Sequence, residues 1–257
     1  MICAGIDVGS RSTKVVLFDS ERRQIVGTEI ADQAIEQDRL ARRLFQRACQ
    51  GAGVEGAAIG RIVATGYGRN VLGFATSTVT EITCHAIGVR YLAPQAQTII
   101  EIGGQDSKAI VLEGDGRVRD FAMNDRCAAG SGRFLEVVAT RLGVGLAALG
   151  ELSRESRKPS VISSVCVVFA ETEIIGLLAE GVAPADIAAG VQNAIAQRVA
   201  ALSARMIAEP VCFTGGVALQ AGMVRALETA LGRRVQLPSL PQYTGALGAA
   251  ILAARNT

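Results

Sequence analysis

The feature that most constrains the fold is an internal repeat of one short motif. The segment IDVGSRSTKVVLFD (6–19) aligns without a gap with IEIGGQDSKAIVLE (100–113). In each copy an acidic residue is followed two positions later by glycine and seven positions later by lysine, as in Asp7 and Lys14. An apolar, β-branched run then begins. Both copies are therefore predicted to be β-hairpins with a tight polar turn.

A second repeated motif supports a duplicated fold. IVATGYG (62–68) and VCFTGGV (211–217) each end an apolar run in Thr-Gly, and each follows a hairpin motif in the same order. We expect two α/β halves, 1–93 and 94–257, that are related by pseudo-symmetry and face each other across a cleft.

Helices are predicted between the repeated strands. Segment 37–53 carries apolar residues at Leu40 and Leu44, and segment 184–208 carries them at spacings of three and four. Alternating strands and helices indicate sheets that are covered by helices.

Composition and charge limit the classes of binding partner and the cellular compartment that the sequence predicts. The formal net charge of the 257 residues is only +2, from 26 interspersed basic and 24 acidic side chains, so no basic patch predicts a nucleic-acid or membrane partner. No apolar run reaches the ~18 residues of a membrane span, and the N-terminal segment lacks signal-peptide features. We expect a cytoplasmic protein whose six cysteines, none in a C-x-x-C pair, stay reduced.

The two turns have the chemistry of a phosphate site. Successive backbone N–H groups, hydroxyls and a lysine form a concavity that attracts anions. The predicted phosphate ligands are Ser10, Arg11, Ser12, Thr13 and Lys14 in the first turn and Gly103, Gly104 and Gln105 in the second. Carboxylates repel phosphate, so Asp7, Glu101 and Asp106 are expected to hold Mg²⁺, mostly through water.

Several motifs together resemble one protein superfamily. The hairpins look like the phosphate loops, and FTGGVALQ (213–220) like the adenosine loop, of the acetate and sugar kinase, Hsp70 and actin superfamily. The motifs NDRCAAGSGRFLE (124–136), SSVCVVFAETEI (163–174), ATGYGRN (64–70) and EIGGQDSK (101–108) are similar to those of activator ATPases of 2-hydroxyacyl-CoA dehydratases. ATP-binding subunits of benzoyl-CoA reductase belong to the same family. The resemblance implies a duplicated actin-like (ribonuclease H-like) α/β fold around a nucleotide cleft.

The resemblance also implies cofactors and partners. It implies ATP or ADP with Mg²⁺, and a homodimer that shares one 4Fe-4S cluster through Cys127 and Cys166 of each chain. A ferredoxin or flavodoxin would supply an electron, which the ATPase would pass to an iron-sulfur acyl-CoA dehydratase or reductase. The residues alone leave open that Cys127 and Cys166 are small buried hydrophobes. The other cysteines are expected in the core: Cys3, Cys49, Cys84 and Cys212.

The physical chemistry of the two cysteine positions agrees with this implication. Each precedes a predicted helix, whose N-terminus carries partial positive charge and unpaired N–H donors that can hydrogen-bond cluster sulfurs. Four thiolates are needed for a cubane cluster, and two chains with two cysteines each would supply them.

The resemblance assigns further roles. The catalytic roles fall on Gln105, Asp106, Glu101 and Asp7, with Gln105 near the terminal phosphate or the attacking water. The adenosine loop contributes Gly215 and Gly216, and Gln220 and Gln242 are expected near the base. Dehydratase activators commonly carry Asp where this chain has Glu101, so the extra methylene is expected to alter metal placement.

Some roles stay open at this stage. His85, the only histidine, is expected to pack or face solvent rather than catalyse. Arg69 is expected either to contact a partner or phosphate or to be a solvated loop residue. Rival functions are a permanently bound benzoyl-CoA-type reductase subunit, a small-molecule kinase on the same fold, and a cluster-free Hsp70-like ATPase.

Overall fold

The chain folds into two compact units, and each unit is built from segments that are not continuous in the sequence. The computed structural model describes residues 1–257 except 164–165, 205 and 256–257. Unit 1 comprises 1–96, 112–119 and 238–257, and unit 2 comprises 97–111 and 120–237.

The two sheets have the same strand order, which confirms the predicted duplication. The first sheet has the order β3-β2-β1-β4-β5, and the second has the order β8-β7-β6-β9-β10. The strands of the first sheet are β1 Ile2–Val8, β2 Ser12–Asp19, β3 Gln24–Asp32, β4 Ile62–Thr65 and β5 Ser77–Thr78. Those of the second are β6 Thr98–Ile102, β7 Ser107–Leu112, β8 Val118–Asn124, β9 Val211–Thr214 and β10 Val235–Gln236.

Both hairpin predictions are confirmed by the pairing of the strands. β1 pairs antiparallel with β2, and β6 pairs antiparallel with β7. The central strands β1 and β6 also pair in parallel with β4 and β9, the strands that end in Thr-Gly. Each sheet therefore brings one polar hairpin turn and one Thr-Gly turn to the same edge.

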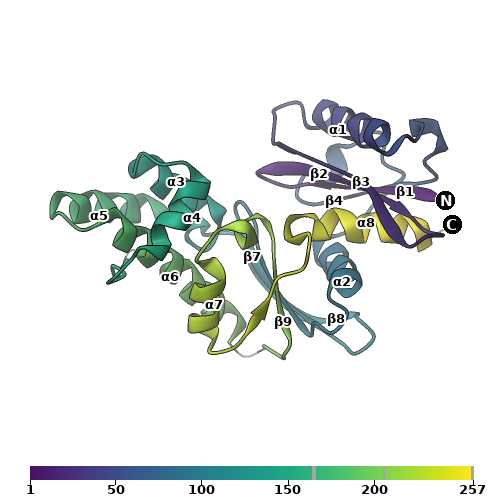
Figure 1. Ribbon diagram of the computed structural model, residues 1–257. Helices are drawn as coiled ribbons and strands as arrows, with labels where there is room; N and C mark the ends of the chain where they lie inside the picture. Colours follow the sequence, from purple (N-terminus) through teal and green to yellow (C-terminus); the bar gives the residue numbers. More distant parts are fainter. Residues whose placement is uncertain (164–165, 205, 256–257) are drawn as a thin grey trace. The chain divides into compact units, whose positions relative to one another are not determined.

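In unit 1, helices cover both faces of the sheet (Figure 1). The helices are α1 Gln37–Ala52, α2 Glu81–Leu92 and α8 Thr244–Arg255. Successive strand residues point to opposite faces, so Val15 and Leu17 pack with α1 whereas Val16 and Phe18 pack with α8. α1 confirms the helix predicted at 37–53.

In unit 2, five helices share one large apolar core with the inner strands. They are α3 Gly132–Arg141, α4 Leu146–Arg154, α5 Val167–Ala179, α6 Pro184–Ser203 and α7 Met223–Leu231. The helix predicted at 184–208 is shorter, since α6 ends at Ser203, and residue 205 lies outside the described residues, as do 164–165 of the motif 163–174. Among the described residues, no helix is both long and apolar enough to cross a membrane.

The C-terminal helix belongs to unit 1. The sequence predicted halves of 1–93 and 94–257, but the chain divides after residue 96, and residues 112–119 and 238–257 cluster with the N-terminal residues. The physical reason is close packing of α8 on α2 and β1. An ideal Cβ on Gly248 would lie 1.8 Å from the carbonyl oxygen of Cys84, and one on Gly5 would lie 1.9 Å from that of Ala246.

This packing predicts the effect of one methyl group on stability. Gly248→Ala forces α8 away from α2, and such overpacking typically costs about 1–3 kcal/mol. We expect a clear fall in the midpoint of urea unfolding. The matched control is Gly176→Ala in α5, where an added Cβ meets nothing within 4 Å and helix propensity improves by about 0.5–1 kcal/mol. Equal midpoints for the two variants would contradict the packing described.

Candidate functional site

The first hairpin turn places a lysine opposite a carboxylate. Asp7 and Lys14 are paired across β1 and β2, and the Gly9 N–H donates to the Ser12 carbonyl at 3.1 Å to close the turn. Lys14 Nζ lies 3.3 Å from Oδ2 of Asp7, and both side chains are largely buried. Ser10 and Arg11 occupy the turn between the closing residues.

The second hairpin repeats this arrangement and adds a third charge. Glu101 and Lys108 are paired across β6 and β7, and the Gly103 N–H donates to the Asp106 carbonyl at 3.0 Å. Lys108 Nζ lies 2.8 Å from both Glu101 and Asp106. The side chains of Lys108 and Glu101 are 4% and 6% exposed, so the charges depend on one another for compensation. Gln105 is exposed in the turn.

Most of the few lysines in the chain lie at these two hairpins. The chain has 23 arginines but only three lysines, of which two are Lys14 and Lys108. The third, Lys158, lies in the loop that follows α4. A compact ammonium group suits phosphate as a point charge, so the placement of the rare lysines favours a phosphate-binding role for both turns.

The second turn brings one oxygen of each of two carboxylates close to Gly103. An ideal Cβ on Gly103 would lie 2.7 Å from Oδ1 of Asp106 and 3.2 Å from Oε1 of Glu101. Lys108 contacts the other oxygen of each carboxylate. Mg²⁺ is commonly held by one or two carboxylates together with phosphate and water. The residues therefore fit Mg²⁺, with the longer Glu101 side chain still reaching the turn.

Each Thr-Gly turn packs against the carboxylate of its own unit. An ideal Cβ on Gly66 would lie 2.4 Å from Oδ1 of Asp7, and one on Gly215 would lie 2.7 Å from Oε1 of Glu101. Both glycines have positive φ, 87° and 91°. In each unit, one carboxylate oxygen thus faces a lysine and the other faces a glycine that cannot be replaced without steric conflict.

Two buried threonine hydroxyls lie next to these two glycines in the sequence. Oγ1 of Thr65 and of Thr214, the residues before these glycines, are buried without a hydrogen-bond partner among the described residues. Unpaired buried polar atoms are uncommon and call for an explanation such as an unplaced ligand or water. The sequence showed the repeated threonines but not that their hydroxyls lack partners.

Other predicted phosphate ligands of the first turn differ in accessibility. Thr13 is fully buried, and its hydroxyl donates to Oε1 of Gln33 at 3.2 Å. The Gln33 amide in turn donates to the Gly9 carbonyl at 2.7 Å, which braces the turn from the end of β3. Arg11 pairs with Asp32 at 3.1 Å. Ser10 and Ser12 are half-buried.

His85 is buried, which agrees with one of the two expected alternatives. It also lies near Asp7. Its Nδ1 is 2.8 Å from Oγ1 of Thr244, which joins α2 to the start of α8. An ideal Cβ on Gly245 would lie 3.3 Å from Oδ2 of Asp7 and 3.4 Å from Nε2 of His85. The sequence did not indicate this neighbourhood, because it joins three distant segments. Arg69 donates to the carbonyl of Gly66, at the Thr-Gly turn.

The predicted adenosine loop begins a packed segment of unit 2. Gly216 starts the 3₁₀ turn η4 (Gly216–Leu219), and Gln220 follows it with a buried Oε1 that has no partner among the described residues. The Gln192 amide of α6 donates to the Ala221 carbonyl at 2.8 Å. Gln242 instead lies in η5 (Pro241–Tyr243) of unit 1, so the two predicted base contacts belong to different units.

Cys127 and Cys166 occupy the same local position in two segments of unit 2. Each has extended backbone and directly precedes a helix, namely the 3₁₀ turn η3 (Ala128–Gly130) and α5. Both thiols are partly exposed and outside disulfides. Asn124 fixes Cys127 by accepting from its N–H at 3.2 Å and donating to its carbonyl at 2.9 Å.

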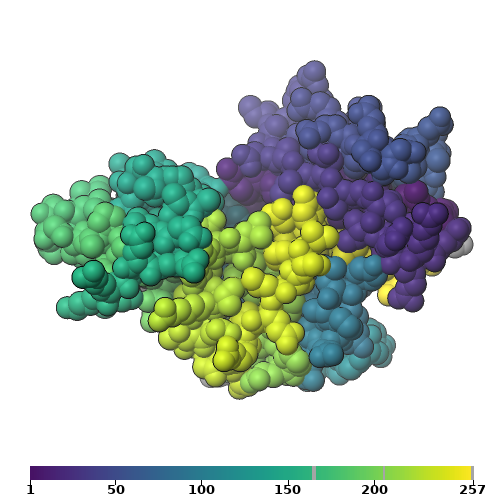
Figure 2. Space-filling view, in the orientation of Figure 1, coloured from purple at the N-terminus to yellow at the C-terminus, as the bar shows by residue number. Residues whose placement is uncertain are grey.

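The cysteine segments fit half of a cubane cluster. The two thiols per chain are two of the four ligands, and no group of three or more metal-ligating side chains occurs among the described residues. α3 packs on α5, and Arg141 forms an ion pair with Glu171 between them. The start of α5 is exposed and apolar, with Val168 and Phe169 67% and 69% exposed, and the green segment that contains α5 forms part of the surface in Figure 2. The donor set is therefore compatible with a cluster completed by a second chain.

Two backbone hydrogen bonds join the second hairpin to the Cys127 segment. The Gly132 N–H donates to the Gly103 carbonyl and the Arg133 N–H donates to the Gly104 carbonyl, each at 2.9 Å. The first residues of a helix have N–H groups with no intrahelical partner. Here the second hairpin turn itself supplies the partners, so the turn and the start of α3 are directly hydrogen-bonded.

The other cysteines are core thiols, as predicted. Cys3, Cys49, Cys84 and Cys212 are buried. Burial raises the pKa of the Cys84 and Cys212 thiols to about 12, and it also raises the pKa of Cys49. The raised pKa keeps the thiols of Cys49, Cys84 and Cys212 protonated at neutral pH, which lowers their reactivity as nucleophiles.

Comparison with known proteins gives a consistent result over the whole chain. The model of the BadF/BadG/BcrA/BcrD ATPase family matches residues 4–253. The activator of lactoyl-CoA dehydratase from Anaerotignum propionicum is 43% identical, over 98% of this chain and 97% of its own. A benzoyl-CoA reductase subunit from Thauera aromatica is 33% identical, over 97% and 92%.

A solved structure agrees with the fold. The activator of the 2-hydroxyisocaproyl-CoA dehydratase from Clostridium difficile with bound ADPNP superposes with a TM-score of 0.94 and 38% identity, covering 100% of this chain and 95% of that one. This agreement confirms the predicted actin-like α/β ATPase fold.

The exposure of the thiols predicts their reactivity. We expect iodoacetamide to alkylate Cys127 and Cys166 of the folded, reduced, metal-free protein before it reaches the four buried thiols. Peptide mass spectrometry along a time course measures the order. Early modification of Cys84 or Cys212 would contradict the positions described.

Proposed function

The chain belongs to the BadF/BadG/BcrA/BcrD ATPase family, and on this premise we propose that it is an ATP-hydrolysing activator. In this proposal it accepts an electron from a reduced ferredoxin or flavodoxin and passes it, at low potential, to an iron-sulfur 2-hydroxyacyl-CoA dehydratase or related enzyme. The similarity to an activator of lactoyl-CoA dehydratase supports this choice of partner class.

The observation that carries the proposal is the backbone link between the second hairpin and the Cys127 segment. Gly103 and Gly104 stand in the turn that has the chemistry of a phosphate site, and their carbonyls hold the first N–H groups of α3. Cys127 precedes this helix by a single 3₁₀ turn. A kinase or a cluster-free ATPase has no need for such a connection to a partly exposed thiol.

We assign the nucleotide roles from the geometry of the two turns. Lys14 and Lys108 neutralise phosphate charge, and the oxygens of Glu101 and Asp106 that face Gly103 hold Mg²⁺. Gln105, exposed in the second turn, orients the attacking water. Ser10, Arg11 and Ser12 are the further phosphate contacts in the first turn, whereas Thr13 is buried and is paired with Val8 and Ala31 inside the sheet. Gly215 and Gly216 remain the proposed adenosine-loop contacts, and Gln220 and Gln242 the proposed base contacts.

In this proposal Cys127 and Cys166 are the ligands of the redox centre. Cys127 and Cys166 of two identical chains would together hold one 4Fe-4S cluster, which when bound supplies a one-electron couple. Helix-terminal N–H groups beside the thiols stabilise negative charge there. The exposed apolar start of α5 gives two copies a surface to bury around the shared site.

Coupling requires that ATP and ADP states interact differently with the chain. Loss of the terminal phosphate would remove the negative charge that draws Lys108 away from its carboxylates. Lys108 then returns to Glu101 and Asp106, as in the structure. The accompanying shift of the Gly103 and Gly104 carbonyls moves the start of α3, and with it the segment that carries Cys127.

A second candidate is an ATP-hydrolysing subunit of a benzoyl-CoA-type reductase, favoured by the similarity to the benzoyl-CoA reductase subunit from Thauera aromatica. Such a subunit stays with its catalytic partners and shares its cluster with an unlike chain. Gel filtration of the anaerobically purified protein from its natural cells distinguishes the two. A separable homodimer supports the activator, and co-purification with catalytic subunits supports the reductase.

Removal of a turn lysine tests the ATPase site. Lys108→Met removes the charge nearest Glu101 and Asp106, and we expect the ATPase rate to fall by about 100-fold or more, the usual loss for one electrostatic stabiliser in a site. Lys158→Met is the matched control and is expected to keep the wild-type rate. Circular dichroism confirms that both variants fold; equal rates in the two would contradict the assignment.

Substitution of the proposed ligands tests the cluster. Cys127→Ser and Cys166→Ser are expected to lose iron and sulfide when purified without oxygen, whereas Cys49→Ala, which alters a buried thiol, is expected to keep them. Iron and sulfide assays with electron paramagnetic resonance measure the result. A serine variant with a full cluster, or iron-free wild-type protein, would refute this part of the proposal.

A further inference from the structure

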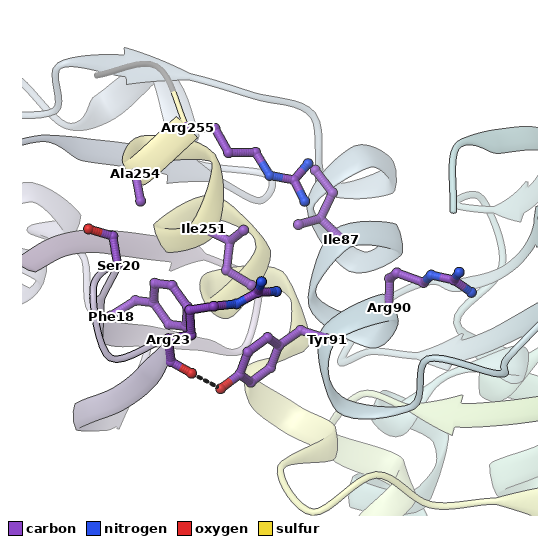
Figure 3. Close-up of a pocket in the computed structure, with 9 residues that line it drawn as sticks. All are labelled: Phe18, Ser20, Arg23, Ile87, Arg90, Tyr91, Ile251, Ala254 and Arg255. Carbon is purple, nitrogen blue, oxygen red and sulfur yellow. Dashed lines mark hydrogen bonds between the residues drawn. The ribbon is translucent and has the colours of Figure 1, made fainter. Parts of the chain in front are cut away.

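A cavity of about 390 Å³ lies in unit 1, between the β2–β3 turn and the C-terminal ends of α2 and α8 (Figure 3). Six of the residues that line it give it its chemical character, namely Phe18, Arg23, Ile87, Tyr91, Ile251 and Arg255. None of them belongs to the turns, the Thr-Gly segments or the cysteine segments described above. The size of the cavity is within the range of small-molecule sites.

The floor of the cavity is apolar and aromatic. Phe18 and Tyr91 meet edge to face, with ring centroids 5.5 Å apart and planes at 88°. Ile87 of α2 and Ile251 of α8 add two aliphatic side chains to the lining. A floor of this kind accepts a flat or aliphatic group and excludes water from it.

The polar side of the cavity carries only positive charge. Arg23 and Arg255 line it without a hydrogen bond or ion pair from either side chain in the described part of the chain, and no acidic residue lines it. A third arginine, Arg90, is engaged with the carbonyls of Pro94 and Gly114, and Figure 3 shows it pointing away from Arg23. Two uncompensated guanidinium groups therefore remain for an anion.

The backbone holds Arg23 in place. Arg23 has a φ of 51°, the one positive φ of a non-glycine residue among those described, and this conformation is unfavourable for a side chain that is not Asn, Asp or Gly. The Tyr91 hydroxyl donates to the Arg23 carbonyl at 2.5 Å, and Asp19 accepts from the N–H groups of Glu21 and Arg22 in the same turn. The turn is thus fixed before any ligand binds, which lowers the entropic cost of binding.

We infer that this cavity is a second binding site of the protein, for a small organic anion in which a phosphate or carboxylate is carried by a flat apolar group. The anionic group is bound by Arg23 and Arg255, and the apolar group lies on Phe18, Tyr91 and Ile251. The inference does not depend on the proposed electron transfer or on ATP hydrolysis.

Titration with phenyl phosphate, followed in the amide ¹H–¹⁵N spectrum of the full-length protein, tests the site. We expect saturable shifts at Ser20, Arg23 and Tyr91, both with and without excess ADP. Inorganic phosphate lacks the apolar group and phenol lacks the anionic group, so each is expected to produce much smaller shifts at equal concentration. Benzoate distinguishes a carboxylate ligand from a phosphate ligand.

Variants then identify the residues responsible. Arg23→Gln is expected to weaken phenyl phosphate binding by about tenfold, the usual effect of losing one charge-assisted hydrogen bond, and Arg255→Gln is expected to act in the same direction. Arg22→Gln is the matched control, since Arg22 is exposed in the same turn but does not line the cavity. Three results would overturn the inference: no shifts at these amides, shifts that ADP abolishes, or equal weakening by Arg22→Gln and Arg23→Gln.

Discussion

The contact of Lys108 with Glu101 and Asp106 is the interaction on which the rest of the site depends. A charge buried to this extent is costly unless it is compensated, and removal of one partner from such a group typically costs several kcal/mol. The lysine and Glu101 are directly paired across β6 and β7, so a register slip of one residue would place the lysine on the wrong face of the hairpin. Asp7 and Lys14 impose the same requirement on β1 and β2, with a longer contact of 3.3 Å. The seven-residue spacing between acid and lysine in both repeats thus serves two ends: it lets the chain reverse, and it places the two charges opposite each other.

The same turn has a second structural task, because it caps the start of α3. The carbonyls of Gly103 and Gly104 accept from Gly132 and Arg133, and Gly132 approaches them so closely that an ideal Cβ would lie 3.1 Å from the Gly103 carbonyl oxygen. Glycine at this position lets the helix terminus reach the turn. A binding event at the carboxylates and a displacement at Cys127 are therefore separated by few covalent and hydrogen-bonded steps.

The sequence was most informative where chemistry is local. The hairpins, the Thr-Gly strand ends and the position of Cys127 and Cys166 before helices all followed from residues close together in the chain. The place of α8 in unit 1, the bracing of the first turn by Gln33 and the neighbourhood of His85 and Asp7 did not, since each depends on contacts between distant segments. The cavity beside Arg23 was also missed, because no motif marks a site built from one turn and two helix ends. Thr13 illustrates a further limit, as alternation along β2 buries a hydroxyl that the turn's composition had assigned to phosphate.

Amide hydrogen exchange at the start of α3 tests the central claim most directly, namely that the nucleotide turn controls the cysteine segment. Exchange is measured by mass spectrometry on the protein alone and with Mg²⁺ and ADPNP, in peptides that cover 102–107 and 131–136. We expect the nucleotide to change exchange in both peptides together, because the N–H groups of Gly132 and Arg133 are bonded to the turn. Exchange that changes at 102–107 and stays the same at 131–136 would contradict the coupling.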